Sequence, residues 1–288
     1  MDLQYNIYKQ YQAFPEYNSP TYAGTDLFAL ALWRNYGATE QTRSRGMEME
    51  AGLWRETANL YNANLRNISG PYDRSYGMDM RSYISVTGLW LRTVLDEDRA
   101  PLAKIEPPVD HVADLWFASP IVVLDTAIPA DALEKFEKLK SEHEITRQID
   151  KNRIATAWIG NTMIYGAEAA NGTRDVDSHS QYHPVTVQWL VPDGQIGWIQ
   201  LIRAPRIDAT ANREGIVIKA TGDIVMRIYA PETTPDRVRG GKWGLPGLNV
   251  ILDTDAKKCS VLKNDKYIDV RYEGLTRMAM RLSEVNQQ

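Results

Sequence analysis

Three short segments of the sequence concentrate side chains that can bind acids or move protons. The first, residues 14–24, places Asn18 and Tyr22 among two prolines and a glycine, directly before a predicted helix. A tyrosine has an unperturbed pKa of about 10, so it abstracts a proton only where cations or hydrogen-bond donors favour its phenolate. The same residues also suit ring packing and helix capping, so a structural role stays open.

The second segment, residues 69–80, has a similar character. It carries Tyr72, Arg74 and Tyr76 in a glycine-containing loop before another predicted helix. The guanidinium of Arg74 is planar and permanently charged, and it therefore suits a substrate carboxylate. An ion pair with Asp73 that orders the loop explains the same residues equally well.

The third segment, residues 168–183, holds two of the four histidines, His179 and His183, together with Arg174 and Asp177. The two histidines and Asp177 could ligate a structural divalent metal, or one histidine could neutralise a substrate acid. Loop spacing alone fixes no ligand geometry, so we expect no cofactor beyond such a metal. His183 is the better functional candidate, because a proline and a predicted strand follow it directly. A solvated polar loop is the alternative.

Helical spacing dominates the first third of the chain. Apolar residues recur at intervals of three, four or seven over residues 27–34, 47–65 and 78–95, which predicts three helices. Strand-like alternation is absent from residues 1–98. A proline-containing stretch, residues 98–108, then indicates a linker, because proline removes backbone donors and favours extended conformations.

Beyond the linker the period changes to two, which predicts a series of strands. The expected strands are 120–124, 153–164, 185–190, 197–202, 215–220, 224–229, 248–252 and 267–272. Turn signals at 192–194, 221–223 and 263–265 favour antiparallel hairpins. Residues 130–144 form the exception and predict a surface helix. We therefore expect an α+β protein of two domains, with a helical domain over 1–106 and a β-sandwich over 107–288.

Composition narrows the function classes. The 288 residues are 43% hydrophobic and 24% charged, which is typical of a folded globular protein. The formal net charge of -4 argues against broad nucleic-acid binding, which needs a basic face. The sequence lacks a signal peptide and an apolar run long enough to span a membrane, so we expect a cytoplasmic location for the chain as given. Phosphate-binding loops, dinucleotide fingerprints and serine-hydrolase elbows are also absent.

The order of these parts resembles the heparinase II/III-like polysaccharide lyases. The resemblance rests on Glu16-Tyr17-Asn18-Ser19-Pro20-Thr21-Tyr22, on the helical stretch 33–95 and on the segment 172–189. It implies an α/α toroid joined to an antiparallel β-sandwich, and β-elimination on glycans that contain uronic acids. It further implies that Tyr22 is the catalytic base and acid and that His183 assists. Substrate-binding candidates are Asn18, Tyr72, Arg74, Tyr76, Arg174 and His179, of which Arg74 is inferred from its charge chemistry.

The chain departs from this family in the length of its helical part. In these lyases earlier toroid helices supply an asparagine that neutralises the uronate carboxylate, and about four helices cannot close a toroid. We therefore expect a truncated enzyme, secreted or on the cell surface, or a helical flank covered by a partner or a second copy. The partner classes are an acidic polysaccharide or an acidic small molecule. Two alternatives stay open: a non-catalytic carbohydrate-binding module, and a cleft repurposed for proton transfer on a small metabolite.

Overall fold

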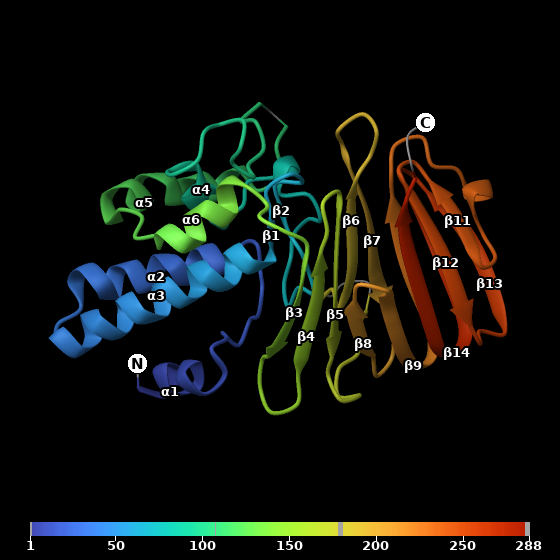
Figure 1. Cartoon of the computed structure of the whole chain (residues 1–288), viewed down its shortest axis with the longest axis horizontal. Helices are drawn as coiled ribbons and strands as arrows, with labels where there is room; N and C mark the ends of the chain where they lie inside the picture. Colours follow the sequence, from blue (N-terminus) through green and yellow to red (C-terminus); the bar gives the residue numbers. More distant parts are fainter. Residues whose placement is uncertain (1, 107, 178–180, 286–288) are drawn as a thin grey trace. The chain divides into compact units, whose positions relative to one another are not determined.

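The structure is a computed structural model that describes residues 2–106, 108–177 and 181–285. Within these residues six α-helices in the N-terminal part are followed by a large antiparallel β-sheet region (Figure 1). The chain divides into two compact units. Unit 1 contains the residues up to Ile68 together with Tyr72–Lys140, and unit 2 contains Ser69–Pro71 and the residues from Ser141 onward. None of the described helices has the length and apolar character needed to span a membrane.

Unit 1 contains the helices. They are α1 (Asp2–Tyr11), α2 (Tyr22–Tyr36), α3 (Glu40–Leu60), α4 (Val86–Arg92), α5 (Ala118–Leu124) and α6 (Ala130–Glu137). Helices α2 and α3 run side by side (Figure 1). The buried ring of Trp54 on α3 packs edge-on against Trp90 and Phe136, with centroids 6.3 and 5.9 Å away. These aromatic contacts join α3 to α4 and α6, and they form the centre of the core of unit 1.

The first turn of α2 lies against α4 because position 24 is a glycine. A Cβ atom at Gly24 would lie 2.3 Å from the backbone nitrogen of Thr87. The Gly24 carbonyl, which lies in the first turn of α2, accepts a hydrogen bond from Nε1 of Trp90 at 2.9 Å. This close approach fixes the end of α2 that carries Tyr22.

A largely buried ion pair connects the other end of α2 with α3. The Arg34 Nε lies 2.7 Å from Oε2 of Glu50, whose side chain is 1% exposed. The Arg34 Nη2 also donates to the carbonyl oxygens of Leu124 and Asp125, at 3.2 and 2.8 Å. Burial raises the pKa of Glu50, and the hydrogen bond from Arg34 opposes that rise. The arginine thereby holds the C-terminal end of α5 against α2.

Three predictions for this part of the chain are wrong in detail. The predicted strand at 120–124 is helix α5, in which Ile121 and Leu124 are buried at helical spacing while the β-branched Val122 and Val123 face solvent. The predicted helix at 78–95 is shorter, with a 3₁₀ turn at Met80–Ser82 before α4. A small hairpin of β1 (Tyr61–Asn62) and β2 (Asn67–Ile68) interrupts the segment in which no strand was expected.

Unit 2 contains twelve described strands in one hydrogen-bonded sheet whose ladders are all antiparallel. The first six are β3 (His143–Gln148), β4 (Ile154–Ile159), β5 (Met163–Ala169), β6 (Val185–Leu190), β7 (Ile196–Arg203) and β8 (Asp208–Asn212). The others are β9 (Gly215–Tyr229), β10 (Val238–Arg239), β11 (Lys242–Leu245), β12 (Leu248–Thr254), β13 (Lys258–Asn264) and β14 (Tyr267–Glu284). The main path runs β10-β11-β12-β14-β9-β7-β6-β5-β4-β3. In addition β8 pairs with β5 and β9, and β13 pairs with β14.

Alternate residues of these strands form one apolar core. Along β9 the residues Ile216, Ile218, Ile224, Met226 and Ile228 are all buried, whereas their neighbours are less so. This period of two is the pattern that predicts antiparallel strands, and the prediction of such a series is confirmed. Residues 153–164, expected as one strand, are instead β4, a turn and the start of β5. The predicted surface helix over 130–144 is α6, which ends at Glu137.

One predicted turn, residues 221–223, is wrong. The chain continues straight through it in β9, and the register between β9 and β14 shifts around Gly222 and Leu275. Gly222 has φ 148°, a value that favours glycine, so it forms an irregularity inside a strand. The turns at 192–194 and 263–265 are confirmed between β6 and β7 and between β13 and β14.

The segment Ser69–Pro71 packs on the β5–β6 ladder within unit 2. Gly166 and Thr186 are register partners in that ladder. A Cβ atom at Gly166 would lie 1.7 Å from the Gly70 carbonyl oxygen, and a Cβ atom at Gly70 would lie 2.2 Å from Thr186 Oγ1. The sheet therefore accepts this segment only because both positions lack a side chain.

Replacing Gly166 by alanine should push the 69–71 segment off the ladder. We expect Gly166→Ala to lower the free energy of unfolding of unit 2 by about 1–3 kcal/mol, the usual cost of overpacking. Gly244→Ala is the matched control, because a Cβ atom there meets open space. Chemical denaturation of both variants measures the effect, and equal stability of the two would contradict the packing argument.

Candidate functional site

The first predicted segment and residues 72–80 of the second lie together in unit 1. The Asp73 backbone nitrogen donates to the Tyr17 carbonyl at 3.0 Å, and the Tyr17 backbone nitrogen donates to Oδ2 of Asp73, also at 3.0 Å. Asp73 therefore binds Tyr17 of the first loop through both its backbone nitrogen and its side-chain carboxylate. This pair of hydrogen bonds ties residues 13–21 to residues 72–79, although more than 50 residues separate them in the sequence.

Tyr22 begins α2 directly after the first loop. The Ser19 hydroxyl oxygen accepts a hydrogen bond from the Tyr22 backbone nitrogen at 3.0 Å, and the Ser19 carbonyl accepts one from Ala23 at 2.9 Å. Together with Gly24 these contacts set the position of the Tyr22 ring. The predicted loop leading into a helix is confirmed here.

Tyr22, Arg74 and Tyr76 meet at this point. The hydroxyl oxygens of Tyr22 and Tyr76 are 3.1 Å apart, within hydrogen-bond distance. The guanidinium carbon of Arg74 lies 4.8 Å from the centroid of the Tyr22 ring, and its Nη1 lies 3.2 Å from Oε1 of Glu16. Three of the candidate residues are thus brought together by the fold.

A residue that sequence reasoning missed completes this group. The His111 ring stacks on the Tyr76 ring, with centroids 4.2 Å apart and planes 5° apart. Its Nδ1 lies 3.9 Å from Oδ2 of Asp114. We call Tyr22, Arg74, Tyr76 and His111 the tyrosine cluster. No pattern in the sequence joins His111 to Tyr76, because residues 77–110, which are largely irregular and include the short helix α4, separate them.

The Tyr76 hydroxyl is a hydrogen-bond donor that stays protonated. The hydrogen bond with Tyr22, followed by burial, raises the pKa of Tyr76 to about 12. Tyr76 therefore keeps its proton at neutral pH and can donate it in a hydrogen bond to the Tyr22 oxygen. The Tyr22 oxygen thus faces a hydrogen-bond donor that stays protonated, and the Arg74 guanidinium lies over the Tyr22 ring.

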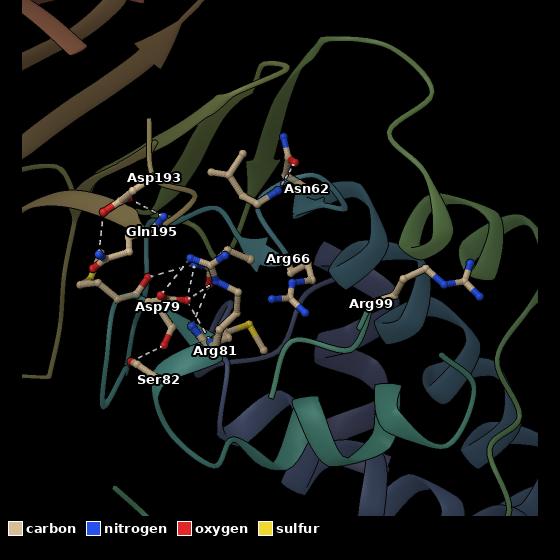
Figure 2. A network of polar contacts seen from close by, with 12 residues as sticks. Asn62, Arg66, Asp79, Arg81, Ser82, Arg99, Asp193 and Gln195 are labelled. Carbon is tan, nitrogen blue, oxygen red and sulfur yellow. Dashed lines mark hydrogen bonds and ion pairs between the residues drawn. The ribbon is translucent and has the colours of Figure 1, made fainter. Parts of the chain in front are cut away.

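The far end of the second loop is anchored by a polar network (Figure 2). One carboxylate oxygen of Asp79 accepts hydrogen bonds from the backbone nitrogen and Nε of Arg81, at 2.9 and 3.1 Å. The Ser82 hydroxyl donates to the Asp79 carbonyl at 2.7 Å. Tyr72 is buried, and its hydroxyl donates to the Ile68 carbonyl. The loop that carries Arg74 and Tyr76 is therefore held at both ends.

A narrow pocket of unit 1 is lined by Glu16, Asn18, Asp26 and Glu56, among others. Its volume is about 20 Å³, which suits about one water molecule. The buried Tyr17 hydroxyl donates to Oε1 of Glu56 at 2.8 Å. Burial, with a smaller effect of Glu16, raises the pKa of Asp26 from its ordinary value to about 7. Asp26 thus exchanges a proton near neutral pH, although the sequence places it on an unremarkable helix face.

The raised pKa of Asp26 predicts a pH dependence of stability. The folded chain prefers protonated Asp26, so the stabilisation is complete below pH 4 and is lost as the pH rises towards 7. We expect wild type to lose about 2–4 kcal/mol relative to Asp26→Asn between pH 4 and pH 8. Urea unfolding at several pH values measures this difference, and parallel curves would refute it.

Asp131→Asn is the control for that experiment. A hydrogen bond from Arg55 lowers the pKa of the exposed Asp131, so its stabilisation is present above pH 4 and is lost as the pH falls. Its difference from wild type should therefore stay nearly constant between pH 4 and pH 8 and should change only at lower pH.

The other candidate residues belong to unit 2. Arg174 lies 3.2 Å from the fully buried Oε1 of Glu168, and its guanidinium carbon lies 3.5 Å from the centroid of the Tyr182 ring. The Tyr182 hydroxyl also donates to Glu168, at 2.9 Å. His183 is half-buried directly before β6, and Asp177 is exposed. His179 lies outside the described residues. Tyr22 and His183 thus belong to different units.

Among residues 2–106, 108–177 and 181–285, no three histidine, cysteine, aspartate or glutamate side chains are grouped as a metal site would require. His179, one of the three residues suggested as ligands, is not in these ranges, so the structural metal stays a prediction.

Comparison with known proteins gives two matches to family models. Residues 2–126 match a model described as a domain of unknown function, DUF8769, and residues 137–229 match a second, DUF8770. No curated protein and no solved structure matches the chain. The first match ends two residues after α5, and the second begins at the last residue of α6 and ends with β9.

Proposed function

We propose that the protein is a polysaccharide lyase-like enzyme that cleaves glycans containing uronic acids by β-elimination. One observation carries this proposal: the Tyr22 and Tyr76 hydroxyls are 3.1 Å apart, with the Arg74 guanidinium 4.8 Å from the Tyr22 ring. A phenol that is held by a donor and faces a cation is suited to act as a base.

The reaction needs one proton removed and one returned. Ionised Tyr22 takes the proton from the carbon beside the uronate carboxyl, and the freed electron pair forms a carbon–carbon double bond as the glycosidic carbon–oxygen bond breaks. The departing oxygen receives the proton from Tyr22, which restores the phenolate. Tyr76 keeps its own proton throughout and stabilises the charge on Tyr22. Arg74 binds the uronate carboxylate and stabilises the negative charge that develops on it.

The remaining candidates take supporting roles in this proposal. His183 assists neutralisation or proton transfer, and Asn18, Arg174 and His179 contact the saccharide, whereas the buried Tyr72 holds its loop in place. We infer that the helices of unit 1 correspond to the last part of an α/α toroid and the sheet of unit 2 to a β-sandwich. The support for these finer statements is the resemblance of residues 16–22, 33–95 and 172–189 to the lyases.

A second candidate function is carbohydrate binding without cleavage. One observation favours it: Trp198, Tyr229 and Tyr267 are half-buried on neighbouring strands β7, β9 and β14, with ring centroids 5.4–6.3 Å apart. Aromatic rings on a sheet surface offer apolar faces to the C–H groups of sugars. Proton transfer on an acidic small molecule is the third possibility, and it requires the same tyrosine cluster.

A set of tyrosine variants tests the lyase proposal. Wild type should produce the ultraviolet absorbance of an unsaturated uronate on at least one polymer of a panel of uronic-acid glycans. Tyr22→Phe should reduce the rate by about 10²–10⁴-fold, because it removes the base. Tyr76→Phe should retain part of the activity and need a higher pH, because a donor to the Tyr22 oxygen is lost. Tyr36→Phe, at an exposed tyrosine on α2, is the control.

Two results would contradict the proposal. One is a folded wild type that gives no absorbance change on any polymer. The other is a Tyr22→Phe variant as active as wild type. Binding of a polymer without any absorbance change would favour the second candidate function.

A further inference from the structure

We infer that unit 2 has its own binding groove for a carboxylated saccharide. Residues that lie opposite one another on strands β3, β4, β5, β8 and β9 line this groove. The groove has a volume of about 430 Å³, within the range of small-molecule sites. The saccharide class rests on the proposed function, but the groove does not include any member of the tyrosine cluster.

Strand pairing places the lining residues in one row. Gln148 is the register partner of Ile154, Ile154 of Ala169, Ala169 of Asp208, and Asp208 of Lys219. Directly opposed residues of antiparallel strands point to the same face of the sheet, so these five side chains share one face. Strand β8 makes this row continuous, because it pairs with both β5 and β9.

Two lysines give the groove a positive charge. Lys219 lies at the β9 end of the row, and Lys151 lies in the turn between β3 and β4. Both are exposed, and within the described ranges neither has a carboxylate within 4.0 Å. Other cations of unit 2 differ in this respect: Arg227 and Arg271 are paired with aspartates at 2.7 and 2.6 Å. Lysines without acidic partners are available to bind an anion from solution.

The polar groups between the lysines favour an anion that also carries hydroxyls. The Asp208 carboxylate lines the groove, and its Oδ1 accepts a hydrogen bond from the Gly172 backbone nitrogen at 3.2 Å. A carboxylate can only accept hydrogen bonds, so a ligand needs hydroxyl donors to face it. A sugar acid has them, whereas a phosphate ion has few donors and is repelled by Asp208. Thr210 and Asn171 add groups that can both donate and accept.

An apolar strip and a fixed turn complete the groove. Ile154 is 38% exposed, and Val217 also lines the groove, so both offer C–H surface to a sugar ring. Asn171 and Gly172 have φ values of 54° and 62°, and the Thr173 nitrogen donates to the Ala170 carbonyl at 3.1 Å. This is a tight turn with two left-handed residues, which holds the Asn171 side chain at the groove. Uronic acids present this combination of carboxylate, hydroxyls and C–H face.

Binding measurements on the full chain test the groove. Trisaccharides of galacturonate, glucuronate and mannuronate are titrated into Tyr22→Phe by calorimetry, so that elimination does not consume them. We expect Lys151→Gln and Lys219→Gln in this background each to weaken binding about threefold, and both together about tenfold. Lys263→Gln, an exposed lysine outside the groove, is the control with the same charge change and should leave affinity unchanged.

The ligand class is tested with two further probes. Trisaccharides whose carboxyls have been reduced to alcohols should bind more weakly than the acids and should not respond to the lysine substitutions. Inorganic phosphate should not compete at equal concentration. The inference is overturned if none of the acidic trisaccharides binds, if the double variant binds like Lys263→Gln, or if phosphate competes as well as the trisaccharides. Circular dichroism checks that each variant is folded.

The readout separates this inference from the lyase proposal. Trisaccharide binding that depends on the two lysines, without an ultraviolet change in wild type, supports the groove and contradicts the lyase. An ultraviolet change that depends on Tyr22, together with trisaccharide binding that does not depend on either lysine, supports the lyase and contradicts the groove.

Discussion

The reciprocal hydrogen bonds between Tyr17 and Asp73 are the constraint on which the tyrosine cluster depends. Tyr22 lies at the start of α2 and Arg74 lies in a loop more than 50 residues later, and closing such a long stretch of chain costs conformational entropy. The entropy is offset here by the α2–α3 pair that connects the two loops and by the polar anchors at both ends of residues 72–79. The Asp73 contact joins the two loops directly and so helps to set the separation of the Tyr22 and Tyr76 hydroxyls.

The charged and polar groups around Tyr22 contribute unequally to the tyrosine cluster. The side chains of Arg74 and Glu16 are 41% and 46% exposed, so water screens their ion pair and it adds little to stability. The same exposure leaves the guanidinium accessible to a carboxylate from solution. The Tyr76 hydroxyl is a more directional influence on Tyr22, because the stacked His111 ring limits its motion. The tyrosine cluster therefore combines a fixed hydrogen-bond donor, the Tyr76 hydroxyl, with a solvent-accessible cation, the Arg74 guanidinium.

Local patterns predicted the elements but not the contacts between them. The helix that begins at Tyr22 and the turn at 192–194 follow from short-range chemistry; Asp193 accepts two hydrogen bonds from Gln195, which stabilise that turn (Figure 2). The β-branched run at 120–124 misled the prediction because buried Ile121 and Leu124, with the Arg34 contacts to the end of α5, decide its structure. The roles of His111 and Asp26 depend on packing between segments far apart in the chain, which no single-sequence period encodes.

The two kinds of cation in unit 2 show how charge pairing separates structural from binding roles. Glu168 is fully buried, and a buried carboxylate without cations would be very unfavourable, so Arg174 and Tyr182 are committed to it. A ligand that recruits Arg174 must therefore replace that pairing. Lys151 and Lys219 stabilise no buried acid, and removing either charge should leave the fold intact. A saccharide acid can thus gain their interaction without opening the core, which is why the groove, more than the Glu168 cluster, is suited to reversible binding.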